Sequence, residues 1–217
     1  VESDVYSAVG VEATTTATQE VRENDNEQKT DTDNLGGSAP AVVHFHAAVT
    51  DAAIFREWQL ARDAEFEIVD NRYQQLDLDY TFTESGVTYV RFVANNAAGT
   101  CEYAGDVYQI SIGESALLCP NAFSPGASEG VNDEWKVSYK SIVKYECHIF
   151  NRWGKEMFSS TDPAIGWDGK QGGKVVPAGV YYYVIVAEGS DGKKYKLSGD
   201  INILKSKTNM RGPSPED

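Results

Sequence analysis

Residues 145–155 of this 217-residue chain have the sequence Y-E-C-H-I-F-N-R-W-G-K and are its clearest guide to the fold. Tyr145, Cys147 and Ile149 alternate with polar residues, a period of two that is typical of a strand with one buried face. Residues 151–154 then have the composition of a turn, and a second short apolar segment follows. The sequence therefore predicts a β-hairpin with an Arg and a Trp at its tip.

Segments with the period of a strand recur on both sides of this hairpin, and no segment of useful length has the period of a helix. The longest strand is expected at residues 180–187. The turn Asp191-Gly192 should connect it to two further strands at 194–197 and 200–204. We therefore predict an all-β fold of two tandem antiparallel immunoglobulin-like β-sandwiches, at residues 41–113 and 114–205.

Residues 1–40 are rich in Thr, Glu, Asp and Asn and contain few large apolar side chains. Such a composition buries too little apolar surface to offset the entropy of the chain, so it predicts a flexible acidic spacer. The formal net charge of −14 lies entirely before residue 114, since residues 114–205 hold 11 acidic and 11 basic residues. This charge argues against binding to nucleic acid and to anionic lipid. No apolar run is long enough for direct insertion into a membrane.

The second sandwich resembles a known family through five blocks that occur in the expected order. The family is the type B C-terminal sorting domain, also called the gliding motility-associated C-terminal domain, of Bacteroidetes proteins exported by the type IX secretion system. The similarity covers residues 117–205. The blocks are P-N-A-F-S-P (120–125), I-F-N-R-W-G (149–154), G-W-D-G-K (166–170), P-A-G-V-Y-Y-Y-V-I (177–185) and G-D-I-N-I (199–203). Residues 41–113 more generally resemble PKD or immunoglobulin-like modules, and residues 206–217 form a tail beyond the usual end of the family.

The resemblance implies a non-catalytic cell-surface protein, associated with the outer membrane after export through the periplasm. Its implied partners are components of the type IX translocon and a porin-like outer-membrane barrel that anchors the chain. Two alternatives stay open: a signal relay of the secretion machinery, and an adhesin module that binds carbohydrate or host protein. The sequence also leaves a homodimer open. It contains no motif of a hydrolase, a phosphate-binding loop or a zinc protease, so we expect no enzyme activity and no cofactor.

Two groups of residues are candidates for contact with a partner protein. Asn151, Arg152 and Trp153 form the hairpin tip, and Arg and Trp are enriched at binding hot spots. The alternative is that the Trp folds under the turn and the Arg pairs with a carboxylate. The second group is Tyr181, Tyr182 and Tyr183, in a strand that is apolar on both faces and must therefore be covered on the second face as well.

Three further patterns have a structural and a functional interpretation. Glu129, Asn132 and Asp133 lie in an oxygen-rich loop that either holds calcium or, as we prefer, forms a structural turn. His44 and His46 share one face of a strand, where we expect exposed edge-strand histidines rather than a metal site. If any of the three cysteines pair, the sequence favours Cys101 with Cys119, and Cys147 as a free core thiol.

Overall fold

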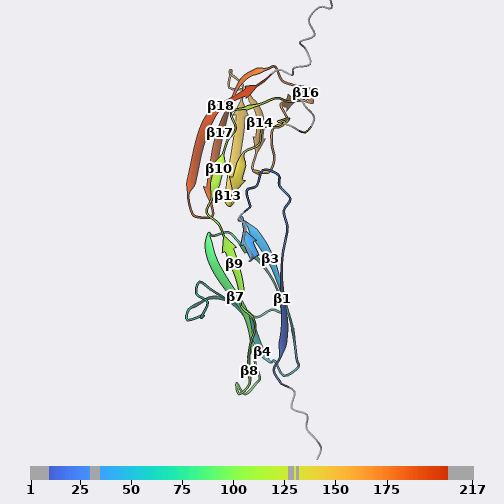
Figure 1. Cartoon of the computed structure of the whole chain (residues 1–217), viewed down its shortest axis with the longest axis vertical. Helices are drawn as coiled ribbons and strands as arrows, with labels where there is room; N and C mark the ends of the chain where they lie inside the picture. Colours follow the sequence, from blue (N-terminus) through green and yellow to red (C-terminus); the bar gives the residue numbers. More distant parts are fainter. Residues whose placement is uncertain (1–9, 30–34, 127–129, 131, 205–217) are drawn as a thin grey trace, which may run out of the picture. The chain divides into compact units, whose positions relative to one another are not determined.

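The computed structural model describes residues 10–29, 35–126, 130 and 132–204, and every described element is a β-strand, turn or loop (Figure 1). The chain forms two compact units. Val1–Arg22 and Thr30–Gly113 belong to the first unit, and Glu23–Lys29 and Glu114–Asp217 belong to the second. No helix among the described residues is long and apolar enough to span a membrane. The predicted all-β fold is confirmed.

The first unit is built from two sheets. One has the strand order β1-β3-β6, and the other has the order β2-β9-β7-β4-β5 with β8 beside β7. All neighbours are antiparallel except β2 and β9. The strands are β1 (Ala13–Gln19), β2 (Leu35–Gly37), β3 (Ala41–Val49), β4 (Phe55–Ala61), β5 (Val69–Tyr73), β6 (Asp77–Phe82), β7 (Gly86–Asn95), β8 (Glu102–Ala104) and β9 (Tyr108–Ile112).

Aromatic side chains from both sheets form the core of the first unit. Trp58 of β4 is fully buried, with its ring centroid 5.3 Å from that of Phe45 and 5.0 Å from that of Phe92. Its indole N–H donates to the carbonyl of Leu76 at 3.2 Å, so burial leaves no unpaired indole donor. Two sheets that meet over such a core form the predicted immunoglobulin-like sandwich.

The second unit contains one large sheet, of order β11-β18-β17-β13-β14, and two short strand pairs, β10-β12 and β15-β16. Its buried centre includes Trp135, Trp167, Ile149, Ile185 and Ile201. The strands are β10 (Ala116–Leu118), β11 (Ala122–Phe123), β12 (Ser138–Lys140), β13 (Ile142–Phe150), β14 (Glu156–Ser160), β15 (Lys170–Gln171), β16 (Lys174–Val175), β17 (Gly179–Gly189) and β18 (Lys194–Ile203).

One expectation for this sheet is wrong, because residues 194–203 form a single strand instead of two. Gly199, which lies between the two predicted strands, pairs with Tyr183 inside the ladder between β17 and β18. A Cβ atom at Gly199 would lie 2.8 Å from the ring of Tyr183. The glycine therefore makes room for a cross-strand aromatic ring and does not end the strand.

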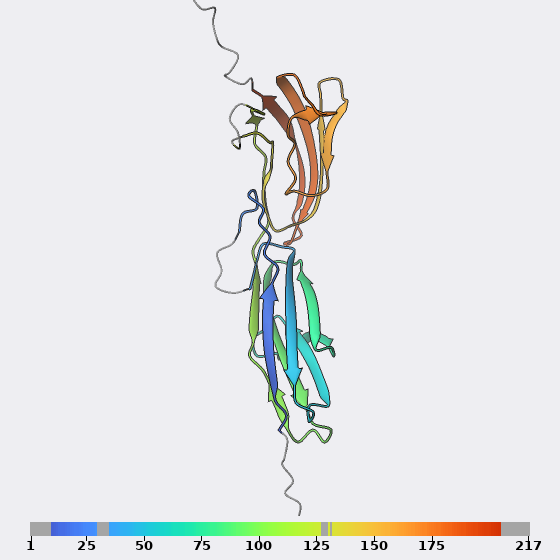
Figure 2. The same ribbon diagram turned by 90° about the vertical axis from the view of Figure 1, so that its right-hand side faces the viewer.

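The structure also differs from the prediction of a flexible spacer at residues 1–40. Residues 13–19 form β1, which pairs along its whole length with β3, as the dark blue strand in Figure 2 shows. This segment is rich in Thr and Ala, residues that suit a strand with one exposed face. Composition alone missed β1 because backbone pairing with β3, more than burial of large side chains, holds this strand.

Residues 23–29 belong to the second unit, although in the sequence they lie between β1 and β2 of the first unit (Figure 2). The backbone of Gln28 donates to the carbonyl of Tyr139 at 2.7 Å, and the backbone of Tyr139 donates to the carbonyl of Asn26 at 3.1 Å. The side-chain amide of Asn26 donates to the carbonyls of Val137 and Pro163, each at 2.8 Å. The segment thus covers an edge of β12 that would otherwise be unpaired.

We expect Asn26→Ala to destabilise the second unit by about 1–3 kcal/mol, because two carbonyls that it satisfies lose their donor. Hydrogen exchange measured by mass spectrometry should show faster exchange around β12. The control is Gln28→Ala, whose exposed side chain donates to the Ser138 hydroxyl and should matter by about 0.5 kcal/mol or less. Unchanged exchange in the Asn26 variant would show that this segment is not docked in solution.

Candidate functional site

The tip of the β13–β14 hairpin is held by the side chain of Asn151. Its carboxamide oxygen accepts hydrogen bonds from the backbone N–H groups of Trp153 at 2.9 Å and Lys155 at 3.0 Å. Gly154 has a φ of 77°, a left-handed conformation that favours glycine. Asn151, one of the residues predicted to contact a partner, thus organises the turn that presents its two neighbouring side chains.

Arg152 and Trp153 project from this turn and stack on each other. The guanidinium carbon of Arg152 lies 4.2 Å from the centroid of the Trp153 ring. Trp153 is 75% exposed, so it does not fold under the turn as the alternative interpretation supposed. Such an Arg–Trp pair combines a planar hydrogen-bond donor with a large apolar surface.

A concave surface of about 480 Å³ lies between this tip and the segment that leads into β17. We call it the tip groove. Its described lining includes three basic residues and no acidic residue, and its exposed apolar side chains include Trp153, Val175 and Val180. The basic residues are Arg152, Lys155 and Lys174. Sequence analysis found Arg152 and Trp153 but did not single out Lys155, which directly follows the turn. It also missed Lys174, because only the fold brings residue 174 near the hairpin tip.

The three tyrosines of β17 have different environments. Tyr181 is 6% exposed, contacts the Trp167 ring at a centroid distance of 5.2 Å and donates its hydroxyl to the carbonyl of Pro177. Tyr183 also points inward and packs against Trp135. Tyr182 points outward and is 47% exposed. Tyr181 and Tyr183 are therefore mainly core residues, and only Tyr182 offers its ring to solvent.

The outward face of β17 presents a row of apolar side chains that we call the outer stripe: Val180, Tyr182, Val184 and Val186, each 44–50% exposed. The pairing register places polar residues of β18 beside this row on one side, for example Lys196 next to Val186 and Ser198 next to Val184. On the other side, His148 of β13 lies next to Val184. The sequence correctly indicated an apolar second face, and the structure leaves that face half-exposed.

The loop with the predicted acidic turn is held by Asp133. One of its carboxylate oxygens accepts from the backbone N–H of Gly126 at 2.9 Å, and the other accepts from that of Gly130 at 2.7 Å. Asn132 has a φ of 53° in the same turn. These bonds favour the structural turn over a calcium loop, while Glu129 lies outside the described residues.

His44 and His46 lie on β3, which is a central strand and not the predicted edge strand, because β1 and β6 flank it. Each imidazole Nδ1 lies near a carboxylate of β6: that of His44 is 2.6 Å from Asp79, and that of His46 is 2.5 Å from Asp77. The hydrogen bond with Asp79 raises the pKa of His44. Among the described residues, no group of three or more His, Cys, Asp and Glu side chains is placed to hold a metal ion.

The three cysteines are all free thiols, so the pairing of Cys101 with Cys119 favoured by the sequence is not formed. Cys147 is buried in the core of the second unit, as predicted from its phase with Tyr145 and Ile149. Burial raises the pKa of its thiol to about 11, which makes a thiolate scarce at neutral pH. Cys147 is therefore an unreactive core residue.

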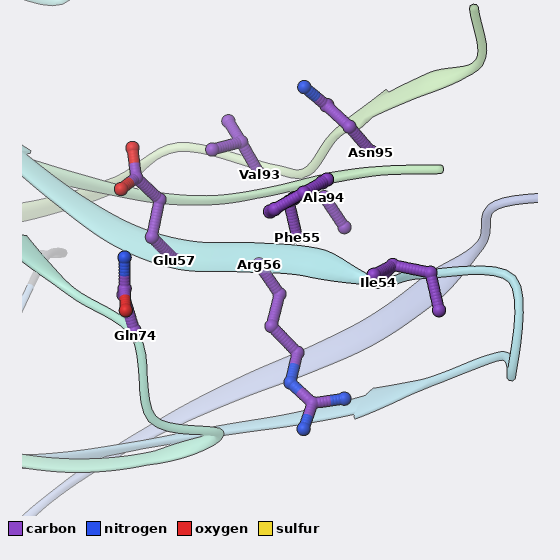
Figure 3. A pocket seen from close by; sticks show the side chains of 8 residues that line it. All are labelled: Ile54, Phe55, Arg56, Glu57, Gln74, Val93, Ala94 and Asn95. Carbon is purple, nitrogen blue, oxygen red and sulfur yellow. The ribbon is translucent and has the colours of Figure 1, made fainter. Parts of the chain in front are cut away.

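The first unit has a pocket of about 460 Å³ where β4 and β7 meet near residues 54–57 and 93–95 (Figure 3). Ile54 and Phe55 are 57% and 62% exposed there. Figure 3 shows Arg56 and Glu57 leaving β4 on opposite sides. The Glu57 carboxylate already accepts hydrogen bonds from Arg72 and Gln59. The pocket thus offers an exposed aromatic ring, with a carboxylate that is already engaged.

The imidazole beside the outer stripe should make the second unit sensitive to pH. His148 lies 3.0 Å from a Glu146 oxygen and 2.7 Å from a Glu156 oxygen, and these hydrogen bonds raise its pKa above 6.5. Because the imidazole has a higher pKa in the folded chain than in the unfolded chain, its protonation stabilises the fold. This stabilisation is complete at pH values below the pKa of the unfolded chain, and it is lost as the pH rises through the pKa of the folded chain.

His148→Gln should therefore destabilise the chain more at about pH 6 than at about pH 9, by under about 1 kcal/mol because the side chain is one-third exposed. Urea unfolding of both proteins at the two pH values measures the difference. An equal effect of the substitution at both values would contradict the role of the two glutamates.

Comparison with solved structures gives only distant likenesses. The fibronectin(III)-like modules of Clostridium thermocellum CbhA align at 10% identity and a TM-score of 0.27, over 92% of this chain and all of that chain. Dimeric latent PorU from Porphyromonas gingivalis aligns at 11% identity and a TM-score of 0.27, over 91% of this chain but only 20% of its own length. Scores this low carry no argument about function. No curated protein matches the chain.

The second unit gives a clear family match. Residues 117–203 match the CHU_C type IX secretion signal domain, almost the same range as the resemblance found in the sequence. That range contains both the hairpin tip and the outer stripe. The chain therefore carries a type IX secretion signal domain of the CHU_C family in its second unit, after an immunoglobulin-like first unit.

Proposed function

We propose that this chain is a non-catalytic cell-surface protein exported by the type IX secretion system and held at the outer membrane through its second unit. In this proposal the signal domain directs export and then binds an outer-membrane protein of the porin-like barrel class. The first unit is displayed outside the cell. The match of residues 117–203 to the type IX secretion signal domain is the observation that carries the proposal, because such a domain implies export and a surface or outer-membrane location in general.

Two surfaces of the second unit support a role in protein contact. The tip groove combines an exposed Trp with three basic side chains, and the outer stripe leaves four apolar side chains half-exposed. Exposed apolar patches with polar surroundings are typical of protein interaction sites. Aromatic and Arg side chains often carry most of the binding energy at such sites.

A second candidate function is ligand binding by the first unit, as in an adhesin that takes carbohydrate or host protein. The pocket with exposed Phe55 favours it, because sugar rings stack on exposed aromatic side chains. Binding of the intact chain to a glycan array, lost in Phe55→Ala, would support this function. It is compatible with export by the type IX system.

The export proposal predicts where the intact chain is found in a host with a working type IX system. A signal peptide and a reporter are fused before residue 1, and surface exposure is measured by protease treatment of whole cells. The intact chain should reach the surface, whereas a chain that lacks residues 114–204 should stay in the periplasm. Periplasmic retention of the intact chain, or its surface exposure in a host without the translocon, would refute the proposal.

The docking proposal predicts that Arg152→Ala folds normally but is released from the outer membrane. An anchor residue should contribute about 2 kcal/mol or more to binding, which is about thirty-fold in affinity. The control is Lys144→Ala, which removes a surface ion pair between β13 and Glu188 of the neighbouring strand β17 and should cost about 0–1 kcal/mol of stability without detachment. If the Arg152 variant stays attached as well as the parent chain, the hairpin tip is not part of the contact.

A further inference from the structure

The charges of the tip groove are opposite to those of the chain as a whole. Arg152, Lys155 and Lys174 line it, and none of its other described lining residues is acidic, in a chain with a net charge of −14. Lys155 donates to the neutral amide of Gln171 at 3.2 Å, and Arg152 stacks on Trp153. The basic side chains of the groove are thus not neutralised by its own described walls, and they attract a negatively charged ligand.

The apolar part of the groove narrows the choice of ligand. Trp153, Val175 and Val180 are 75%, 58% and 45% exposed, and Pro177 and Ala178 add further carbon surface to the lining. A small anion would leave these side chains in water. A ligand that carries both carboxylates and an apolar side chain satisfies both parts of the groove.

We propose that the tip groove binds an acidic, extended peptide segment of a protein partner, with an apolar side chain seated between carboxylates. The apolar side chain packs on Trp153 and Val175, and the carboxylates pair with Arg152 and Lys174. This inference rests on the proposed function for its setting, since it names the chemistry of the partner that the signal domain docks to.

The turn is built so that peptide binding requires little ordering. The two backbone hydrogen bonds to the Asn151 side chain fix the tip, and the stacking on Trp153 holds the planar donors of Arg152. A guanidinium held in this way can make two parallel hydrogen bonds to one carboxylate. Because these side chains are already positioned, less affinity is lost to conformational entropy.

Trp153 supplies a spectroscopic signal for a direct test on the intact chain. The other three tryptophans, Trp58, Trp135 and Trp167, are at most 2% exposed, so acrylamide quenches mainly the fluorescence of Trp153. The probe is a synthetic peptide, Gly-Asp-Glu-Leu-Asp-Glu-Gly with blocked ends. Its matched controls replace every acidic residue with the corresponding amide, or with Lys. Binding of the acidic peptide should protect Trp153 from acrylamide, and added salt should weaken that binding because the charges are exposed.

Arg152→Gln and Lys174→Gln should each lower the affinity for the acidic peptide by about ten-fold or more, the loss of one charge-assisted hydrogen bond. Lys144→Gln, outside the groove, is the matched control and should change it less than about two-fold. Calorimetric titration of each variant provides a second measurement. Circular dichroism shows whether each variant is folded.

Four results would overturn the inference. One is equal binding of the amide and acidic peptides, which would mean that the groove selects apolar content alone. Another is the absence of any protection by the acidic peptide, and the third is binding that survives both groove substitutions. Stronger protection by anionic lipid vesicles than by the peptide would likewise assign the groove to a membrane surface. None of these results would refute the export proposal if the parent chain still reaches the cell surface. Failure of the peptide-binding inference can therefore be told apart from failure of the export proposal.

Discussion

The antiparallel ladder between β13 and β17 positions both surfaces of the second unit. In this register Ile149 lies opposite Tyr183 and Phe150 lies opposite Tyr182. Since side chains alternate between faces, this register sends Tyr181, Tyr183 and Ile185 into the core and leaves Tyr182 and its neighbours outside. A shift by one residue would bury the outer stripe and expose the core tyrosines. The buried ring contacts of Tyr181 with Trp167 and Tyr183 with Trp135 hold the register.

The same ladder explains why the hairpin tip meets the segment before β17. Antiparallel pairing places the end of β13 beside the beginning of β17, so Arg152 and Trp153 emerge near residues 174–180. The basic side chains from these two segments then share one concave surface. Like charges that line one surface repel one another, and the cost is low here because the three side chains are exposed to water. If the groove binds an acidic peptide as proposed, the arrangement gives up a little stability of the free protein and gains electrostatic attraction for that peptide.

The sequence predicted what depends on local alternation and failed where distant pairing decides. The hairpin at residues 145–155 and the strand with Tyr181–Tyr183 could be recognised from a period of two and from turn residues. Strand β1 could not, because its Thr-rich composition resembles a spacer and only its pairing with β3 makes it a strand. The continuous strand β18 was also missed, since Gly199 lies inside it and leaves room for the ring of Tyr183 on the neighbouring strand. Within the site, Arg152 and Trp153 could be recognised from their residue types, whereas Lys174 could be assigned to the tip groove only once the fold was known.

The segment at residues 23–29 shows that the second unit is larger than its family match. Asn26 lies outside the matched range of 117–203, yet its side chain donates to the carbonyl of Val137, which lies 111 residues further along the chain. Bringing such distant residues together costs loop-closure entropy. The hydrogen bonds that offset this cost can form only when β12 and its neighbours are already in place. We therefore expect this contact to form late in folding, after the strands of the large sheet have paired. Two partly buried hydrogen bonds depend on it, so a signal domain cut at the matched boundary would keep the hairpin tip and the outer stripe but would leave the edge of β12 open.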